Sequence, residues 1–486
     1  MPRMYITTPI YYANGPAHLG HAYTTIAGDV IARWYRLKLG DKNVLFTTGM
    51  DEHGSKVQKA AKEKGVSPQK FVDGMAERFK NTWKLLHISY DDFIRTTEKR
   101  HKETVKKVFK KLVDSGDIYK GIYEGWYCVP CESFWTDLQL AEEKCPECGR
   151  KVDKVKEESY FFRLSKYQDK LLKLYEDRPD FLSPKHRSKE IVNRVKEGLK
   201  DLSISRKKVD WGIEFPLDPK LTLYVWKEAL INYLSLVGFP DGKKFKEFWP
   251  AIHIMAKEIY WFHGVIWPAM LMSAGIPVPR KVFAHGWLTV EGRKMSKSFG
   301  NFLVPEDIVK KYGVDQFRYF LMKSLPFGED GDFSEEALRA RINGELVADL
   351  GNLVSRVTKL AERHEGKLCG KDALGDRLEL KQIEKDMEAF ELHHALEKIW
   401  SFVRICNKYI NNNEPWKQSG KELGETMYNL LEALRVLSVL LEPFLPETAG
   451  RLRKQLRIGP GTIRDCAFRK EATRPGKGEH LFRRVE

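Results

Sequence analysis

The apolar and polar positions near the N-terminus alternate between the spacing of strands and the spacing of helices. Tyr5–Ile10 and Val44–Thr48 have the pattern of buried strands, whereas Ala22–Leu39 repeats apolar residues at helical intervals. Further helices are expected over Ser67–Leu86 and Glu98–Ser115. This alternation predicts an α/β fold with a parallel sheet of Rossmann type, which binds ligands beyond the carboxyl ends of its strands.

The pattern changes from about Ile118, where short aromatic runs, grouped cysteines and lysine-rich stretches begin. This character continues to about Pro216, and alternating strands and helices then resume. The sequence therefore predicts one nucleotide-binding domain that is split by an inserted domain. The expected elements of its second half are a helix over Leu221–Val237, a strand over Ala251–Ala256, a helix over Ile259–Ala274 and a strand over Val282–Trp287.

The C-terminal third has the amphipathic spacing of an α-helical bundle. Short helices are expected at Pro305–Tyr312 and Val314–Leu325, and a helical pattern runs from about Glu335 to Leu456 with a break at Asn411–Pro415. The last thirty residues are basic and irregular, as in a docking tail or a partly disordered segment. The predicted domains are 1–117 and 217–290 for the split catalytic domain, 118–216 for the insertion, 291–334 for a loop with linking helices, and 335–486 for the bundle.

The composition indicates the net charge of the protein and the cellular compartment expected for it. The 486 residues carry 83 basic and 67 acidic side chains, a formal charge of +16. This excess suits a polyanionic partner, and the affinity for such a partner falls with salt. No apolar run approaches the roughly 20 residues that span a bilayer, and the N-terminus lacks a signal-peptide pattern. A cytoplasmic protein without a membrane partner is therefore expected.

Four of the seven cysteines form two pairs in the predicted insertion. Two residues separate Cys128 from Cys131 and Cys145 from Cys148, and thirteen residues lie between the pairs. Thiolates at this spacing can close a tetrahedral zinc site. Disulfides are the alternative, but a cytoplasmic chain disfavours them. Because the protein would fill all four positions, the predicted zinc ion is structural.

Two segments far apart in the chain contain residues suited to phosphate chemistry. In the first, two histidines share one face of a helix start, where imidazoles, backbone N–H groups and the helix dipole can hold a triphosphate. In the second, two lysines can stabilise negative charge on a leaving pyrophosphate. Alone, the first segment also fits two surface histidines at a helix start, and the second fits an exposed basic turn. The segments are His18-Leu19-Gly20-His21 and Lys294-Met295-Ser296-Lys297-Ser298.

Together and in this order, the two segments resemble the HIGH and KMSKS motifs of class I aminoacyl-tRNA synthetases. The run before the first segment, Pro9-Ile10-Tyr11-Tyr12-Ala13-Asn14-Gly15, is similar to the start of the methionyl-tRNA synthetase family. The predicted insertion, 118–216, is much shorter than the editing insertion of the isoleucine, valine and leucine enzymes.

The resemblance implies a methionine–tRNA ligase that works in two steps. ATP with Mg²⁺ converts methionine to methionyl-adenylate and pyrophosphate, and initiator or elongator methionine tRNA then accepts the methionine. The implied catalytic residues are the two histidines and two lysines of the paired segments. The implied ATP contacts are His18, Gly20, His21, Lys294, Lys297 and Ser298.

The resemblance also implies a methionine site. Asp51 matches the aspartate that binds the substrate ammonium group, although a helix-capping loop aspartate is the plainer interpretation of this residue alone. Sulfur near aromatic ring edges gains roughly 0.3–1.5 kcal/mol per contact. Any single aromatic residue of the site could equally be plain core. The matching apolar cage is Ile10, Tyr12, Trp226, Ala229, Tyr233, Phe262, His263 and Trp267.

In the bundle, the resemblance implies an anticodon site. Trp416 matches a tryptophan that stacks on an anticodon base, and Asn352 and Arg356, four apart on one helix face, match residues that recognise base edges. The alternative for Trp416 is a core position at a helix start. Many family members have a further C-terminal domain; this sequence ends before one, so we expect either a monomer or a separate tRNA-binding subunit.

Three functions are alternatives to the methionine–tRNA ligase: another synthetase, a binding protein and a nucleotidyltransferase. Another small class I synthetase, such as the cysteine enzyme, would need an open zinc site, whereas four cysteines close it. A tRNA-binding relative without catalysis would not need His18, His21, Lys294 and Lys297. A nucleotidyltransferase of the same superfamily leaves the bundle with Trp416 unexplained.

Overall fold

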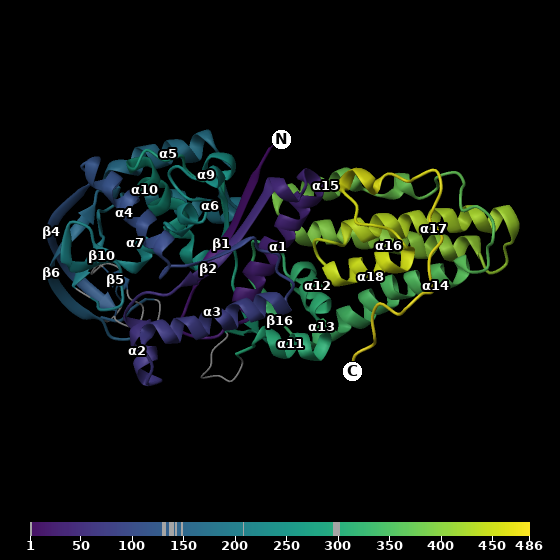
Figure 1. Cartoon of the computed structure of the whole chain (residues 1–486), viewed down its shortest axis with the longest axis horizontal. Coiled ribbons are helices and arrows are strands. Elements are labelled where there is room, and N and C mark those ends of the chain that lie inside the picture. The colour runs from purple at the N-terminus through teal and green to yellow at the C-terminus, as the bar shows by residue number, and fades with distance from the viewer. Residues whose placement is uncertain are drawn as a thin grey trace.

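A computed structural model describes residues 2–128, 133–135, 140, 143–146, 149–207, 209–294 and 302–486. The molecule is elongated, with the sheets gathered at one end and the helices α14 to α18 at the other (Figure 1). Within the described ranges, no helix combines the length and apolar composition needed to cross a bilayer.

The sheet that carries the catalytic domain has six strands, and every neighbouring pair runs parallel. Parallel strands place their carboxyl ends at one edge, where open α/β sheets bind ligands. The predicted Rossmann-type architecture is therefore confirmed. In spatial order the strands are β3 (Asp92–Arg95), β2 (Val44–Asp51), β1 (Met4–Tyr12), β12 (Ile252–Ala256), β13 (Lys281–His285) and β7 (Leu182–Ser183).

The helices of the first half follow the predicted alternation closely. Three of them were expected, and a fourth, α2, begins directly after the polar loop that follows β2. Its high content of lysine concealed a narrow buried face formed by Val57 and Ala61. The helices are α1 (Leu19–Leu39), α2 (Ser55–Glu63), α3 (Pro68–Leu85) and α4 (Lys99–Asp114).

The single helix predicted over Leu221–Val237 is wrong. The chain instead forms strand β11 (Asp218–Leu223) and the short helices α7 (Val225–Ala229) and α8 (Asn232–Ser235). The Asn232 side-chain amide donates to the Ala229 carbonyl at 2.7 Å, so it satisfies a helix-end acceptor and ends α7.

The helix predicted over Ile259–Ala274 is present but divided. A 3₁₀ turn at Lys257–Ile259 and a π-helical turn at Phe262–Ile266 precede α10 (Trp267–Ser273). Pro268 lies in the first turn of α10 and has no N–H to donate, which accounts for the irregular hydrogen bonding before it.

The region predicted as an insertion contains a four-stranded antiparallel sheet and two strands of a smaller three-stranded sheet, whose middle strand β11 lies beyond it. Strand β7 lies inside the same range but pairs with β13 at the edge of the main sheet. The domain boundaries stay a prediction. The elements are β5 (Ser133–Trp135), β4 (Ile118–Cys128), β6 (Asp153–Phe162), β8 (Leu202–Ser203), β10 (Glu214–Phe215), β9 (Ser205–Lys207), α5 (Gln168–Asp177), α6 (Lys185–Lys196) and, beyond the insertion, α9 (Lys243–Phe248).

A small sheet and two helices connect the catalytic end to the helical end. The sheet is formed by β14 (Leu288–Val290), β15 (Arg293–Lys294) and β16 (Gly331–Phe333), and the helices are α11 (Pro305–Tyr312) and α12 (Val314–Ser324). Both helices match their predicted positions within one residue.

The predicted helical bundle is confirmed, and helix α16 ends at Asn413, inside the predicted break, where Glu414 adopts a left-handed conformation. A second break, between Ala361 and Leu380, was not predicted. The C-terminal segment packs onto the bundle, because Leu481 and Phe482 are buried and Arg451 donates to the Leu481 carbonyl at 2.7 Å. The helices are α13 (Glu335–Arg341), a π-helical stretch (Ile342–Gly351), α14 (Asn352–Ala361), α15 (Leu380–Ala389), α16 (Leu392–Asn413), α17 (Gly420–Leu440) and α18 (Pro446–Leu456).

A buried ion pair joins the two ends of the molecule. The Arg318 guanidinium on α12 donates to the Asp29 carboxylate on α1 at 2.7 Å, and both side chains are fully buried. The same guanidinium donates to the carbonyls of Leu86, Pro443 and Phe444. Arg318 therefore ties the catalytic domain to the bundle through four hydrogen bonds.

Candidate active site

The two predicted histidines lie at the start of α1. The Gly20 N–H donates to Nδ1 of His18 at 3.1 Å, and the His18 N–H donates to Nδ1 of His21 at 3.4 Å. A neutral imidazole has one donor and one acceptor nitrogen, so both rings carry their proton on Nε2. The start of α1 thus presents two imidazole donors next to the positive end of the helix dipole.

The two rings stack on each other, with centroids 3.6 Å apart. His21 also packs against Tyr11 and Phe79, at 4.7 and 5.7 Å between ring centroids. Desolvation by these surroundings, followed by the adjacent His18, lowers the pKa of His21 well below its ordinary value. His21 is therefore a neutral hydrogen-bond donor near pH 7, not a cation.

The chain that follows the segment with the predicted lysines lies beside these histidines. Lys294 is the last residue of β15, whereas Lys297 and Ser298 lie outside the described residues. Where the described chain resumes, the Phe302 ring packs edge-on against His18 at 5.7 Å. The Leu19 N–H donates to the Leu303 carbonyl at 3.2 Å. The structure therefore places the residues that follow the second segment, Phe302 and Leu303, beside the start of α1.

Asp51 is placed at the carboxyl end of β2, where its neighbour on β1 is Tyr12. Its side chain is buried, and its carbonyl accepts a hydrogen bond from Ala13 at 2.9 Å. Two residues earlier, opposite Ile10, the chain needs glycine: a Cβ on Gly49 would lie 2.3 Å from the Ile94 carbonyl oxygen. Ile10, Tyr12 and Asp51 thus share one end of neighbouring strands.

The aromatic residues predicted for methionine form two contacting groups. Trp226 stacks on Phe262 with centroids 4.7 Å apart. Tyr233 lies against His263 and Trp267, at 5.6 and 6.2 Å between ring centroids. Ala229 is buried on the helix that carries Trp226.

Hydrogen bonds fix the protonation of the second group. Nδ1 of His263 lies 3.0 Å from the Ile259 carbonyl and therefore donates to it, so Nε2 accepts from the Tyr233 hydroxyl at 2.7 Å. Burial lowers the pKa of His263 to about 4, which keeps the ring neutral. A neutral, apolar wall suits a thioether better than a charged one would.

The sequence did not single out His253, which joins this group from β12. Its Nε2 accepts from the Trp267 indole N–H at 3.2 Å, and its Nδ1 donates to Thr7 at 2.7 Å. Burial and the neighbouring His263 lower the pKa of His253 well below its ordinary value. A histidine inside the apolar strand predicted over Ala251–Ala256 was the available signal for this residue.

A second polar cluster was also missed. The buried Glu228 carboxylate contacts Nδ1 of His53 at 2.8 Å and Nε2 of His101 at 2.7 Å. Burial alone would raise the pKa of Glu228, but the two imidazoles lower it to about 2. This cluster braces the loop after β2, directly following Asp51, against helix α7.

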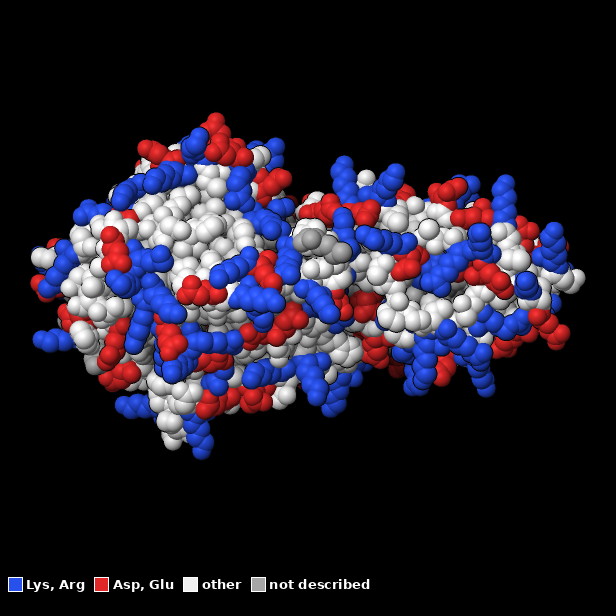
Figure 2. Space-filling model, turned by 45° about the horizontal axis from the view of Figure 1, so that its top comes forward, with Lys and Arg blue, Asp and Glu red and all other residues white. Residues whose placement is uncertain are grey.

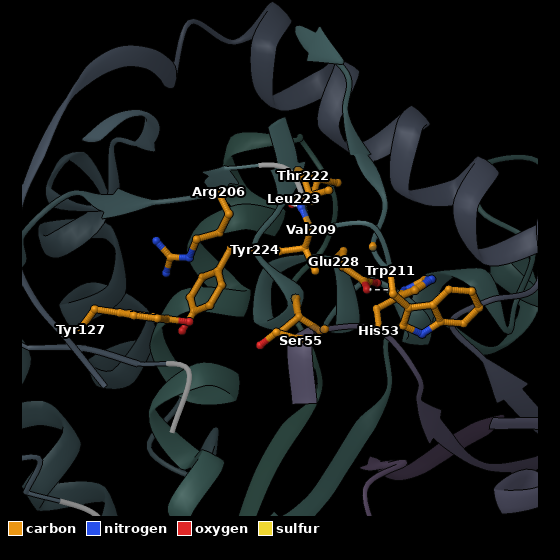
Figure 3. Close-up of a pocket in the computed structure, with 13 residues that line it drawn as sticks. His53, Ser55, Tyr127, Arg206, Val209, Trp211, Thr222, Leu223, Tyr224 and Glu228 are labelled. Carbon is orange, nitrogen blue, oxygen red and sulfur yellow. Dashed lines mark hydrogen bonds and ion pairs between the residues drawn. The ribbon is translucent and has the colours of Figure 1, made fainter. Parts of the chain in front are cut away.

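The pocket shown in Figure 3 opens beside this cluster. It encloses about 60 Å³, and His53, Trp211, Tyr224 and Arg206 belong to its lining. In Figure 3 the Tyr127 and Arg206 side chains lie on one side and His53 and Trp211 on the other. None of the site residues predicted from the sequence lines this pocket. The lining residues at 53–55 and 224–225 lie close to Asp51 and Trp226 in the sequence.

Lys227 is an unexpected charged residue behind the aromatic wall. Its side chain is buried, and its Nζ lies 5.1 Å from the Phe262 ring centroid and 5.6 Å from that of Tyr224. Burial and the nearby Arg206 lower the pKa of Lys227 to about 7. Within the described part of the chain, Lys227 forms no ion pair with a carboxylate.

Half of the predicted zinc ligands can be described. Cys128 and Cys145 are buried and share a small cluster with Val152. The Gly149 N–H donates to the Cys145 carbonyl at 2.8 Å in a tight turn, with Gly149 at φ +67°. Such a turn after the first cysteine of a pair fits a zinc knuckle. Cys131 and Cys148 lie outside the described residues.

The predicted anticodon residues gather in the helical bundle. The Arg356 guanidinium lies 5.8 Å from the Trp416 ring centroid and donates to Asn411 at 2.9 Å. Asn352 is exposed one helical turn before Arg356 on α14, and 43% of Trp416 is exposed, so it is not a core residue. On the face shown in Figure 2, basic and acidic side chains are interspersed from the catalytic end to this bundle.

Comparisons with known proteins agree with this geometry. Residues 4–156 and 149–358 match the family described as tRNA synthetases class I (M), and residues 379–477 match the anticodon-binding domain of tRNA ligase. Methionine–tRNA ligase of Caldanaerobacter subterraneus is 49% identical over 99% of this chain and 79% of its own length. That of Thermotoga maritima is 46% identical over 100% of this chain and 80% of its own length.

Solved structures give the same result. Mycobacterium tuberculosis methionyl-tRNA synthetase in complex with methionyl-adenylate superposes with a TM-score of 0.94 and 40% identity, over 99% of this chain and 100% of that one. Its free-state structure gives 0.87 and 36%, over 100% and 99%. The resemblance inferred from the two short segments is thereby confirmed. The chain belongs to the methionyl-tRNA synthetase family of class I aminoacyl-tRNA synthetases.

Proposed function

We propose that this chain is a methionine–tRNA ligase whose first reaction takes place at the start of α1. The observation that supports the proposal is the contact of Leu19 and His18 with Leu303 and Phe302, residues that follow the second phosphate-handling segment by a few positions. Methionine carboxylate oxygen attacks the α-phosphorus of ATP, and the bond to the bridging oxygen of pyrophosphate breaks. No covalent nucleophile is needed from the protein, because alignment and charge stabilisation suffice.

Each predicted residue has one role in this proposal. The Nε2–H groups of His18 and His21 donate to phosphate oxygens, and Lys294 and Lys297 stabilise the leaving pyrophosphate together with Mg²⁺. Gly20 and Ser298 belong to the same ATP site. Asp51 holds the methionine ammonium group, because a carboxylate buried at a strand end gains a cationic partner there. The aromatic wall around Tyr233 and His263 receives the thioether.

The second reaction transfers methionine to tRNA. A ribose hydroxyl at the 3′ end of the tRNA attacks the carbonyl carbon of methionyl-adenylate, and AMP leaves. We assign Trp416 to stacking on an anticodon base and Asn352 and Arg356 to base edges, supported by the proximity of Arg356 to Trp416. Cytoplasmic translation is the proposed setting.

A structural zinc ion in the insertion is part of the proposal. The buried thiols of Cys128 and Cys145 and the turn at Gly149 support it. Cys131 and Cys148 would complete a four-thiolate set, which holds zinc without an open position. Zinc would then stabilise the insertion and take no part in the chemistry.

Pyrophosphate exchange into ATP, measured with each of the twenty amino acids and without tRNA, tests the function. We expect exchange with methionine alone. Exchange with another amino acid would keep the synthetase class and refute the methionine site. A complete lack of exchange, both without tRNA and with methionine tRNA added, would refute the ligase and favour a tRNA-binding relative.

A further inference from the structure

Two adjacent histidines and a glutamate converge at the junction of α15 and α16, far along the chain from the site above. Helix α15 ends at Ala389, Phe390 adopts a left-handed conformation with φ +65°, and α16 begins after Glu391. One ligand atom each of Glu391, His393 and His394 lies within 4.8 Å of the other two. Neighbouring helical residues normally point about 100° apart, yet these two imidazole rings lie 4.0 Å apart.

The hydrogen bonding of this cluster is incomplete. Nδ1 of His393 is buried and has no hydrogen-bond partner, since the nearest Glu391 carboxylate oxygen is 3.9 Å away. Oδ2 of Asp386, in the last turn of α15, is likewise buried without a partner. Buried polar atoms are almost always satisfied by protein, water or an ion. Two buried atoms without a hydrogen-bond partner, beside a cluster of ligand groups, therefore indicate a binding site for an ion.

The surrounding charges favour a cation. Glu391 interacts electrostatically with Asp386, and with Glu329 and His186 of the catalytic end. Lys323 is the basic residue that acts on His393. The C-terminal carbonyls of α15 lie beside the start of α16, so the negative end of one helix dipole offsets the positive end of the other.

We propose that Glu391, His393 and His394 bind a divalent transition-metal ion of the zinc class. Two imidazoles and one carboxylate suit zinc, cobalt, nickel or copper, whereas calcium and magnesium prefer oxygen ligands. Ligands of zinc at about 2.1 Å lie roughly 3.4 Å apart. Because the three ligand atoms lie within 4.8 Å of one another, they need to approach by at most about 1.4 Å. His394 is exposed and can move.

The ion would lie where the bundle meets the catalytic domain. The Phe390 ring packs against Phe283 of β13 with centroids 5.4 Å apart, and Nζ of Lys281 lies over the Phe390 ring at 5.1 Å from its centroid. A metal ion would therefore fix the turn that carries Phe390 and would face Glu329 and His186. The site is separate from the four cysteines and from the residues assigned to methionine and ATP.

The test uses the untagged full-length chain with its cysteine site already loaded with zinc. Cobalt(II) is titrated and followed by visible absorption, because thiolate ligation adds a strong charge-transfer band that imidazole and carboxylate ligands lack. We expect one further equivalent to bind below 100 µM, about 5.5 kcal/mol, without a thiolate band. His393→Ala and Glu391→Gln should each weaken binding at least tenfold, and zinc should raise the melting temperature of the wild type only.

His480→Ala is the matched control, because His480 is exposed and only its backbone carbonyl is bonded, to Arg451. This variant should bind cobalt like the wild type. Each variant is used only if its melting temperature without added metal matches that of the wild type. If a variant fails this criterion, His394→Ala replaces it, because the His394 side chain is exposed. Binding only at millimolar metal, or equal binding by the variants, would overturn the proposal.

Discussion

The hydroxyl of Tyr233 donates a hydrogen bond to Nε2 of His263 at 2.7 Å, inside a wall that is otherwise apolar. The pair fixes one tautomer and one orientation of a buried ring. Because His263 contributes a neutral edge to the proposed methionine site, the hydroxyl acts on the substrate only through the ring.

Tyr233→Phe should therefore lower both stability and methionine affinity. The change leaves a buried acceptor without a donor, which costs about 1–3 kcal/mol. Urea unfolding measures the loss, and methionine-dependent pyrophosphate exchange should show a raised KM. Tyr23→Phe is the matched control, since the buried Tyr23 hydroxyl has no hydrogen-bond partner and its removal should be nearly neutral. Equal effects of the two variants would contradict this role of Tyr233.

Replacements at His21 separate its two nitrogens. Asparagine can keep an acceptor near the position of Nδ1 but loses the distal donor, whereas glutamine supplies an amide N–H near the position of Nε2. If Nε2–H donates to phosphate, His21→Asn should slow adenylate formation by about 100-fold, and His21→Gln should retain more activity. Rapid-quench measurement of the first turnover checks this. The opposite order would assign the histidine to helix capping alone.

Lys227→Met should stabilise the protein at neutral pH. The folded pKa of Lys227 is about 7, below the ordinary value of 10.5. Between these values the unfolded chain binds more protons, so wild-type stability rises with pH across that window. Replacing the buried ammonium with methionine should add about 1–4 kcal/mol at pH 7, and the advantage should shrink towards pH 10. Denaturant unfolding at several pH values measures both variants; a difference that is constant with pH would contradict the assignment.

Trp416→Ala should weaken tRNA use without affecting amino-acid activation. Loss of one stacked base costs about 1–3 kcal/mol, so KM for tRNA should rise while exchange without tRNA stays unchanged. Trp416→Phe keeps a flat ring at the same position and should retain most of the affinity. An unchanged KM for Trp416→Ala would remove this residue from the proposed anticodon site.

Cys145→Ser should release the proposed structural zinc. The expected result is loss of one chelator-resistant equivalent of zinc, measured by elemental analysis, with a lower melting temperature of the insertion. Cys369→Ser changes an exposed cysteine elsewhere in the chain and serves as the control. Retention of zinc by Cys145→Ser would count against four-thiolate ligation.

Local patterns predicted the strands and long helices well because burial and periodicity act over neighbouring residues. Helix α11 has the bounds that its apolar spacing predicts, and β1, β2 and β12 are close to theirs. The failures arose where a single side chain changes the backbone. Asn232 ends α7 and Pro268 disturbs the turn before α10, and neither effect appears in a hydrophobic pattern.

The same limit applies to the site. The paired segments and the aromatic cage could be predicted because their residues match motifs of a known family. His253 and the Glu228 cluster could not, because their roles come from contacts between strands and helices that are distant in sequence. A buried glutamate between two imidazoles is visible only once His53 and His101 have been brought to it.

Arg318 has a consequence for how this protein can be divided or recombined. Four of the five N–H donors of an arginine are here bonded across one junction, and two of the acceptors, the carbonyls of Pro443 and Phe444, belong to the bundle. A bundle transplanted from a distant relative would have to present those carbonyls at the same points. Without them two buried N–H donors would lose their acceptors, at a cost of about 1–3 kcal/mol each. The two ends of the molecule therefore behave as a single folding unit and not as exchangeable modules.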